Sequence, residues 1–184
     1  MEEQRLHRCA GFGLWPRQKQ SSVLGKWLQC RCIRSIAICH ENLEKLARER
    51  RLTVKTKIGD MLNLPYEDES FDCLLSYQVI YHTDSKGIQK AIGEIGRVLR
   101  PGAEFFITLI SKQNKSYIEH RNECIDENTI LKKEEPEIGV PHYYVDVDDI
   151  YRIFGDMKIL NIRQIESIVR PQNGFHYHVL GRKE

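Results

Sequence analysis

The feature that most constrains the fold is a regular alternation of strand-like and helix-like segments from about residue 35 onward. Residues 35–39 form a short apolar run, and residues 41–51 follow with apolar side chains on one helical face amid charges. Residues 53–58 alternate in polarity, and residues 71–77 contain a continuous apolar run typical of a buried parallel strand. These patterns predict three strands and, between the first two, a surface helix.

The second half of the chain continues the alternation and ends in two consecutive strands. A helix is predicted at residues 86–99 and a strand at 104–110. A second helix is predicted from Asp146 onward, and two final strands are predicted at 158–168 and 175–181. The pair Pro101-Gly102 is expected to stop the first of these helices. The pair Asn173-Gly174 is a strong turn signal, so the last two strands are predicted to form an antiparallel hairpin.

This order of elements predicts the fold class. Alternating strands and helices indicate an α/β fold with a mainly parallel sheet and helices on both faces. The terminal hairpin makes the sheet mixed, so we predict a Rossmann-like doubly wound mixed sheet with a C-terminal antiparallel hairpin. In such sheets ligands bind beyond the carboxyl ends of the strands, and site residues are expected in the loops that follow them.

The composition excludes several classes of protein. The 184 residues suffice for one hydrophobic core, and 29% of them are charged, with a mean hydropathy of −0.49. No segment approaches the roughly 20 apolar residues of a membrane span, so no membrane partner is expected. The formal net charge is only +2, which disfavours a nucleic-acid partner. The six cysteines lack the spacing of a disulfide framework or a zinc ribbon, which favours a cytoplasmic location.

The charge is unevenly distributed along the chain. Residues 1–34 contain seven basic and two acidic side chains, a balance of +5, so the remaining residues sum to −3. A secretory signal needs a continuous apolar stretch, and this basic segment contains none, so no secretory signal is expected. We therefore divide the chain into a divergent basic N-terminal segment, residues 1–34, and an α/β domain, residues 35–184.

Three stretches, in this order and spacing, carry a resemblance to a known family: residues 59–66 (GDMLNLPY), 69–76 (ESFDCLLS) and 94–103 (EIGRVLRPGA). They resemble class I S-adenosylmethionine-dependent methyltransferases, and in particular the branch that acts on small molecules. The resemblance extends from about residue 36 to the C-terminus. It implies S-adenosylmethionine as the cofactor and methyl transfer to a small-molecule acceptor as the function.

The resemblance also implies a set of cofactor-binding residues. Asp60 and Met61 would contact the adenine, with Asp60 accepting a hydrogen bond from the exocyclic amine. Ser76, Tyr77 and Gln78 would lie beside the methionine part of the cofactor and the substrate entrance. The competing interpretation of Asp60 is an ordinary turn residue after a glycine, and that of Tyr77 is packing.

The residues expected on the acceptor side are Tyr81, His82 and His142. For Tyr81 the alternative is core or rim packing. His142 is the candidate general base in case the acceptor must lose a proton, although a lone histidine is more often a polar surface or core residue. His176 and His178 share a strand face, but they lack a third ligand, so no metal site is expected.

Two features of the family are missing from this sequence. No glycine-rich turn precedes residue 35, because Gly11-Phe12-Gly13 lies far upstream and follows no predicted strand. Ala37 stands where the family has an acidic residue that binds the ribose hydroxyls. We therefore expect a first strand that is missing or altered and cofactor binding that is impaired. The alternative function is that of a noncatalytic Rossmann-like remnant, a binding or interaction module. The acceptor atom and the oligomeric state have no signature in the sequence.

Overall fold

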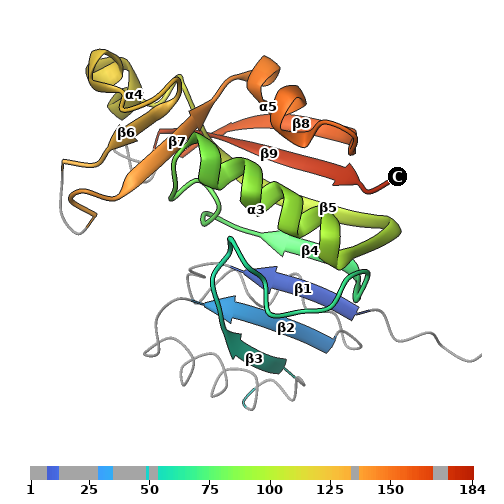
Figure 1. Ribbon diagram of the computed structural model, residues 1–184. Coiled ribbons are helices and arrows are strands. Elements are labelled where there is room, and N and C mark those ends of the chain that lie inside the picture. The colour runs from blue at the N-terminus through green and yellow to red at the C-terminus, as the bar shows by residue number, and fades with distance from the viewer. Residues whose placement is uncertain (1–7, 13–28, 35–48, 50–53, 134–136, 168–173) are drawn as a thin grey trace, which may run out of the picture.

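The computed structural model describes residues 8–12, 29–34, 49, 54–133, 137–167 and 174–184. Within these residues the chain forms a nine-stranded mixed sheet with helices packed against it (Figure 1). The strands are β1 (Arg8–Phe12), β2 (Gln29–Arg34), β3 (Val54–Ile58), β4 (Phe71–Ser76), β5 (Leu99–Ser111), β6 (Thr129–Leu131), β7 (Pro141–Val145), β8 (Lys158–Glu166) and β9 (Phe175–Arg182). The helices are α3 (Ser85–Val98), α4 (Lys115–His120), the 3-10 turn η1 (Arg121–Glu123) and α5 (Val147–Phe154).

The order of the strands confirms the predicted sheet. It runs β3-β2-β1-β4-β5-β7-β6, and β9 pairs with both β5 and β8. The neighbours from β3 to β5 are parallel, as is the short pairing of β5 with β7. β9 is antiparallel to β5 and to β8, and β6 is antiparallel to β7. The fold is therefore a Rossmann-like mixed sheet with a C-terminal antiparallel hairpin.

Most elements lie where the sequence patterns predicted them. The strands predicted at 53–58 and 71–77 are β3 and β4, and the final hairpin is β8 and β9. α3 begins after Asp84, whose side chain accepts a hydrogen bond from the Gly87 N–H, and it buries an isoleucine face against the sheet. The predicted strand at 35–39 lies outside the described residues, as does the predicted helix at 41–51 except for residue 49.

The N-terminal strand corrects one prediction. β1 pairs in parallel with β2 on one side and with β4 on the other, so it occupies the centre of the sheet. Gly11 and Phe12 are its last two residues, and the prediction that Gly11-Phe12-Gly13 follows no strand is wrong. A five-residue segment with an arginine and a glycine has little strand propensity of its own, and pairing on both edges determines its conformation. The division of the chain at residues 34 and 35 rests on sequence alone and stays a prediction.

The end of α3 corrects a second detail. The helix ends at Val98 as expected, but β5 begins immediately at Leu99, so Pro101 and Gly102 lie inside the strand rather than in a loop. The register between β4 and β5 shifts here, which lets the strand tolerate a proline that cannot donate to the ladder. Gly102 has a φ of 80°, and its N–H donates to the carbonyl of Lys183.

The main core lies between the sheet and the helices α3 and α5, which lie side by side on one face (Figure 1). Phe105 of β5 and Phe154 of α5 stack with ring centroids 5.1 Å apart and an interplanar angle of 7°. Cys73 of β4 is disulfide-bonded, which the cysteine spacing did not predict. Among the described residues, none of the helices has the length and apolar character that crossing a bilayer requires.

Candidate functional site

The residues predicted to bind the cofactor lie after two strands of the parallel part of the sheet. Asp60 and Met61 come shortly after β3, Ser76 ends β4, and Tyr77 and Gln78 follow it. β2 and β1 lie between these two strands. Because all four strands are parallel, their carboxyl ends share one edge of the sheet, which is the edge where doubly wound folds bind ligands.

Asp60 forms a turn, which is the alternative interpretation that the sequence analysis gave for this residue. Its Oδ1 accepts a hydrogen bond from the Leu62 N–H at 2.9 Å, and its carbonyl accepts one from the Asn63 N–H at 3.1 Å. These bonds form a tight turn directly after β3. The side chain is nevertheless exposed, and an ionised carboxylate has about four acceptor positions, so the turn leaves capacity for a ligand donor.

The loop after β3 is fixed to α3 by two charged residues whose role the sequence analysis did not predict. The Arg97 guanidinium donates to the carbonyls of Leu64 at 2.9 Å and Tyr66 at 2.7 Å. Glu94 Oε2 accepts from the Leu64 N–H at 2.7 Å, and Glu94 also pairs with Arg97. The hydrogen bond from Arg97 holds the pKa of the Glu94 carboxyl below its ordinary value. Both residues belong to the 94–103 stretch of the family resemblance, which gives that stretch a physical reason.

The end of β4 carries an unpaired buried hydroxyl and a strained backbone. Ser76 is fully buried, and its Oγ makes no hydrogen bond. Gln78 has a φ of 54°, a region that few residues other than glycine adopt. Its N–H donates to Thr108 Oγ1 of β5 at 2.6 Å, which helps to hold this conformation. Orphaned polar groups and strained residues of this kind cluster at functional sites.

The three residues predicted on the acceptor side lie together. The ring centroids of Tyr81 and His82 are 4.6 Å apart, those of His82 and His142 are 4.6 Å apart, and those of Tyr81 and His142 are 5.7 Å apart. Tyr81 and His82 belong to the loop after β4, and His142 belongs to β7. The Tyr143 N–H donates to the Tyr81 carbonyl at 2.8 Å, which ties this loop to β7. Burial is the main cause that raises the pKa of Tyr81, so its phenol stays protonated.

The protonation of His142 bears on its predicted role as a base. Burial, followed by repulsion from His82 and Lys132, lowers the pKa of His142 to about 3. The ring is therefore neutral at neutral pH, with a lone pair available. A general base works best when its pKa is near the working pH, so this environment favours a role in holding a ligand over one in accepting a proton. Catalysis by His142 stays a prediction.

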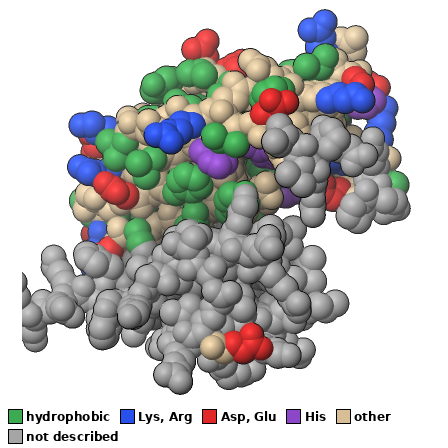
Figure 2. Space-filling view, turned by 180° about the vertical axis from the view of Figure 1, so that it is seen from behind, with side chains coloured by type: hydrophobic (Ala, Val, Ile, Leu, Met, Phe, Trp, Pro, Cys, Tyr) green, Lys and Arg blue, Asp and Glu red, His purple; other side chains and the backbone are tan. Residues whose placement is uncertain are grey.

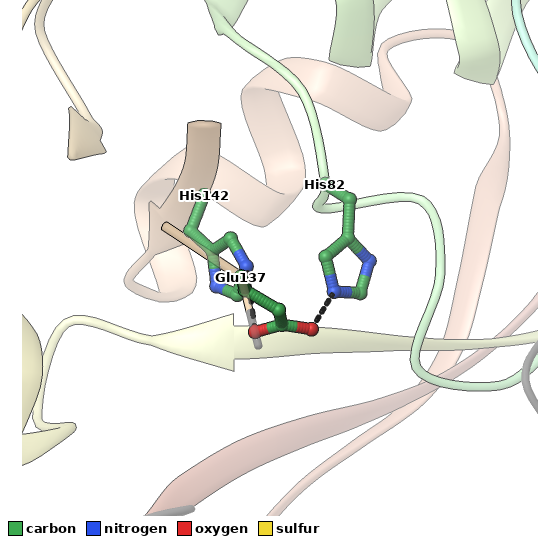
Figure 3. A group of neighbouring side chains, drawn as sticks. All are labelled: His82, Glu137 and His142. Carbon is green, nitrogen blue, oxygen red and sulfur yellow. Dashed lines mark hydrogen bonds and ion pairs between the residues drawn. The ribbon is translucent and has the colours of Figure 1, made fainter. Parts of the chain in front are cut away.

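Glu137 is a member of this cluster that the sequence analysis missed. Its Oε1 lies 3.3 Å from His82 Nε2, and its Oε2 lies 3.3 Å from His142 Nε2 (Figure 3). Neither ring nitrogen of His142 makes a hydrogen bond to any residue that the structure describes. Seen from behind, histidine side chains reach the surface among hydrophobic ones (Figure 2). Because His82 lies 55 residues from Glu137 in the sequence, no local spacing signals the group.

Part of the chain is similar in sequence to known methyltransferases. Residues 21–107 match a family model described as a methyltransferase domain, a stretch slightly shorter than half of the chain. A probable tRNA methyltransferase 9B of Mus musculus is 37% identical over 75 residues, which are 40% of this chain and 16% of that protein. Norajmaline N-methyltransferase of Rauvolfia serpentina is 39% identical over 80 residues, 44% of this chain and 26% of that protein. The chain thus spans about a quarter or less of these relatives.

The likeness to solved structures extends over nearly the whole chain. An S-adenosylmethionine-dependent methyltransferase from Methanosarcina mazei superposes with a TM-score of 0.79, at 19% identity, over 98% of this chain and 94% of that one. At this identity the match shows the fold. Residues 21–107 thus resemble a methyltransferase domain in sequence, and the chain shares the fold of this S-adenosylmethionine-dependent methyltransferase.

Proposed function

We propose that the chain transfers a methyl group from S-adenosylmethionine to a small-molecule acceptor. The observation that carries this proposal is the arrangement along one edge of the sheet. Asp60 follows β3 and Ser76 ends β4, Tyr81 and His82 lie in the loop after β4, and His142 of β7 packs against these two rings. An exposed carboxylate suits an adenine amine, and a largely buried aromatic cluster with a partly exposed histidine suits a small organic acceptor.

The described residues fit the expected cofactor. Ser76 offers a buried hydroxyl that has no hydrogen-bond partner among the described residues, and the turn at Asp60 leaves acceptor positions on its carboxylate. Asp60 and Met61 would hold the adenine, and Ser76, Tyr77 and Gln78 would lie beside the methionine part. When bound, the cofactor supplies a methyl group on a sulfonium, which is already activated for displacement. Ala37 and the turn after β1 lie outside the described residues, so the proposal rests on the β3 and β4 side of the site.

The protein's own part in the reaction would be alignment and exclusion of water. Holding an acceptor in line with the methyl group supplies proximity and orientation. Tyr81 keeps its proton and can donate a hydrogen bond to an acceptor oxygen or nitrogen. His82, at the edge of the cluster, is the more accessible of the two histidines, with its side chain 20% exposed against 4% for His142.

The acceptor class is the finer part of the proposal. One of the relatives is named for a small molecule, norajmaline, and another is named as a probable tRNA methyltransferase. The near-neutral net charge and the partly buried aromatic cluster favour the small molecule. The cytoplasmic location in the same proposal rests on the cysteine spacing alone, and the disulfide bond of Cys73 does not favour it.

Cofactor binding is the first test. We expect the full chain to release or absorb heat on titration with S-adenosylmethionine, and its melting temperature to rise with cofactor concentration by mass action. Asp60→Ala should weaken binding by roughly 10-fold, as loss of a hydrogen bond to a charged group predicts. Glu67→Ala is the matched control, because Glu67 is an exposed carboxylate that follows the same strand and lies further along the loop.

The contrary outcome has a definite meaning. If millimolar cofactor gave no heat and no thermal stabilisation, the remaining candidate function would be that of a noncatalytic Rossmann-like module. The presence of Ala37 in place of an acidic residue favours this second candidate. If the cofactor binds, formation of S-adenosylhomocysteine with a panel of small amines, thiols and phenols, compared with bulk tRNA, distinguishes the acceptor classes. Turnover with tRNA alone would contradict the small-molecule proposal.

A further inference from the structure

We propose that His82, Glu137 and His142 form a binding site for a divalent transition-metal ion of the zinc type. One ligand atom from each of the three residues lies within 4.8 Å of the others. Two imidazoles and one carboxylate are a donor set that zinc sites use. The earlier expectation of no metal rested on His176 and His178, which are different residues. This inference does not depend on methyl transfer.

The spacing of the ligand atoms matches such an ion. Two ligands bound at 2.0–2.1 Å with a tetrahedral angle lie about 3.3 Å apart. Glu137 Oε1 lies 3.3 Å from His82 Nε2, and Glu137 Oε2 lies 3.3 Å from His142 Nε2, so each histidine already has this distance to one oxygen of the carboxylate. The carboxylate lies between the two rings, with one oxygen toward each (Figure 3).

The hydrogen bonding of His82 prepares it as a ligand. Its Nδ1 lies 2.9 Å from the carbonyl oxygen of Val79, which can only accept, so the proton is on Nδ1. In a neutral ring the Nε2 lone pair then points toward Glu137 Oε1, which is also only an acceptor. A backbone carbonyl on the remote ring nitrogen is the usual arrangement for a histidine that binds a metal through its other nitrogen.

His142 supplies the second, independent observation. Its side chain is 4% exposed, and neither of its ring nitrogens makes a hydrogen bond, although Nε2 lies 3.3 Å from Glu137. Buried polar groups without a partner are uncommon and call for an explanation. A single cation between the three residues would bind the Nε2 of each histidine together with the carboxylate, and the two rings lie 4.6 Å apart.

The surrounding backbone holds the three residues in place. His142 is in β7, opposite Ile130 of β6. Glu137 begins a turn in which the Val140 N–H donates to the Glu137 carbonyl at 2.9 Å, and the Gly139 N–H donates to Lys132 at 2.7 Å. The His82 N–H donates to the Val79 carbonyl at 3.0 Å. The ligands thus come from two short hydrogen-bonded turns and a strand, which supports a defined geometry.

Calorimetric titration of the metal-free full chain with Zn²⁺ alone, without S-adenosylmethionine, tests the site. We expect one ion per chain with micromolar or tighter affinity, and no binding of Mg²⁺, which prefers oxygen ligands. Co²⁺ should give the visible absorption of a tetrahedral complex. Glu137→Gln, which keeps the shape of a partly exposed side chain and so should fold, and His82→Ala should each weaken Zn²⁺ binding by 100-fold or more.

His120→Ala is the matched control. His120 Nδ1 also pairs with a glutamate, Glu123 at 3.4 Å, but no second histidine completes that pair among the described residues. We expect this variant to bind Zn²⁺ like the unmodified chain. Absence of stoichiometric Zn²⁺ binding, or equal losses in His120→Ala and His82→Ala, would overturn the proposal. If the chain binds S-adenosylmethionine but not Zn²⁺, only the metal-site proposal is contradicted. If it binds Zn²⁺ but not S-adenosylmethionine, only the proposed function is contradicted.

Discussion

At the scale of single residues, Glu94 shows how a partly buried charge positions the loop after β3. Its carboxylate accepts from the Leu64 N–H and from Arg97, while Arg97 donates to two carbonyls of the same loop. The loop begins beside Asp60, so the pair transmits the position of α3 to the predicted adenine side. The Glu94 side chain is only 17% exposed, which limits the screening of its hydrogen bonds by solvent.

Glu94→Gln should therefore lower stability in a pH-dependent way. The folded pKa of Glu94 lies below its ordinary value of 4.5, so its stabilisation is present above that pH and is lost as the pH falls through the folded pKa. We expect the variant to lose roughly 2 kcal/mol at pH 7 and to converge on the unmodified chain in acid. Urea unfolding between pH 7 and pH 3 measures this. Glu67→Gln, at an exposed position, is the control, and parallel curves for Glu94→Gln and the unmodified chain would contradict the prediction.

At the scale of elements, α5 depends on a capping box that is also an ion-pair centre. Asp146 and Asp149 each accept the other's backbone N–H, at 2.9 and 3.0 Å. Asp149 is buried and pairs with Lys112 at 2.6 Å and with Arg152. The helix has eight residues, too few to be stable alone, so its cap and its packing on the core must hold it.

Asp149→Ala should destabilise the fold by about 3 kcal/mol, because it removes a cap and the partner of a mostly buried lysine. Asp148→Ala is the control: this acid lies in the same first turn but is exposed, and its loss should cost less than about 0.5 kcal/mol. Urea denaturation of both variants measures the difference. Similar losses in the two would mean that the helix dipole, and not the buried pair, accounts for the effect.

The elements differ in how far the sequence could predict them. α3 was predictable because Ile88, Ile92 and Ile95 repeat at helical spacing and all three are buried. β6 and β7 were not, since strands of three and five residues with few alternating positions carry little periodic signal. α4 was missed for a similar reason, because its six residues bury no side chain.

At the scale of the whole molecule, the site depends on contacts that no local pattern contains. The family resemblance indicated Tyr81, His82 and His142, and the pairing of the Tyr81 loop with β7 brings them together. Glu137 joins them through the β6–β7 hairpin, and that hairpin was itself not predicted. Residues brought together by long-range packing therefore emerge only from the three-dimensional fold, whereas the place of residues directly after strands could be predicted from the sequence, and their binding roles stay predictions.

The central position of β1 gives the last prediction. Because β1 is paired with β2 and with β4, its amides are expected to exchange with solvent about 1,000-fold or more slower than unstructured amides, as in the rest of the core sheet. Hydrogen exchange of the full chain measures this, with the exposed Glu67 and Asp68 as fast references and β4 as the slow one. If β1 exchanged as fast as these references while β4 stayed protected, β4 would be an open edge prone to pairing with another chain. Gly11 and Phe12 of β1 would then no longer be held against Leu75 and Ser76 of β4, next to the predicted cofactor site, which would favour the noncatalytic module.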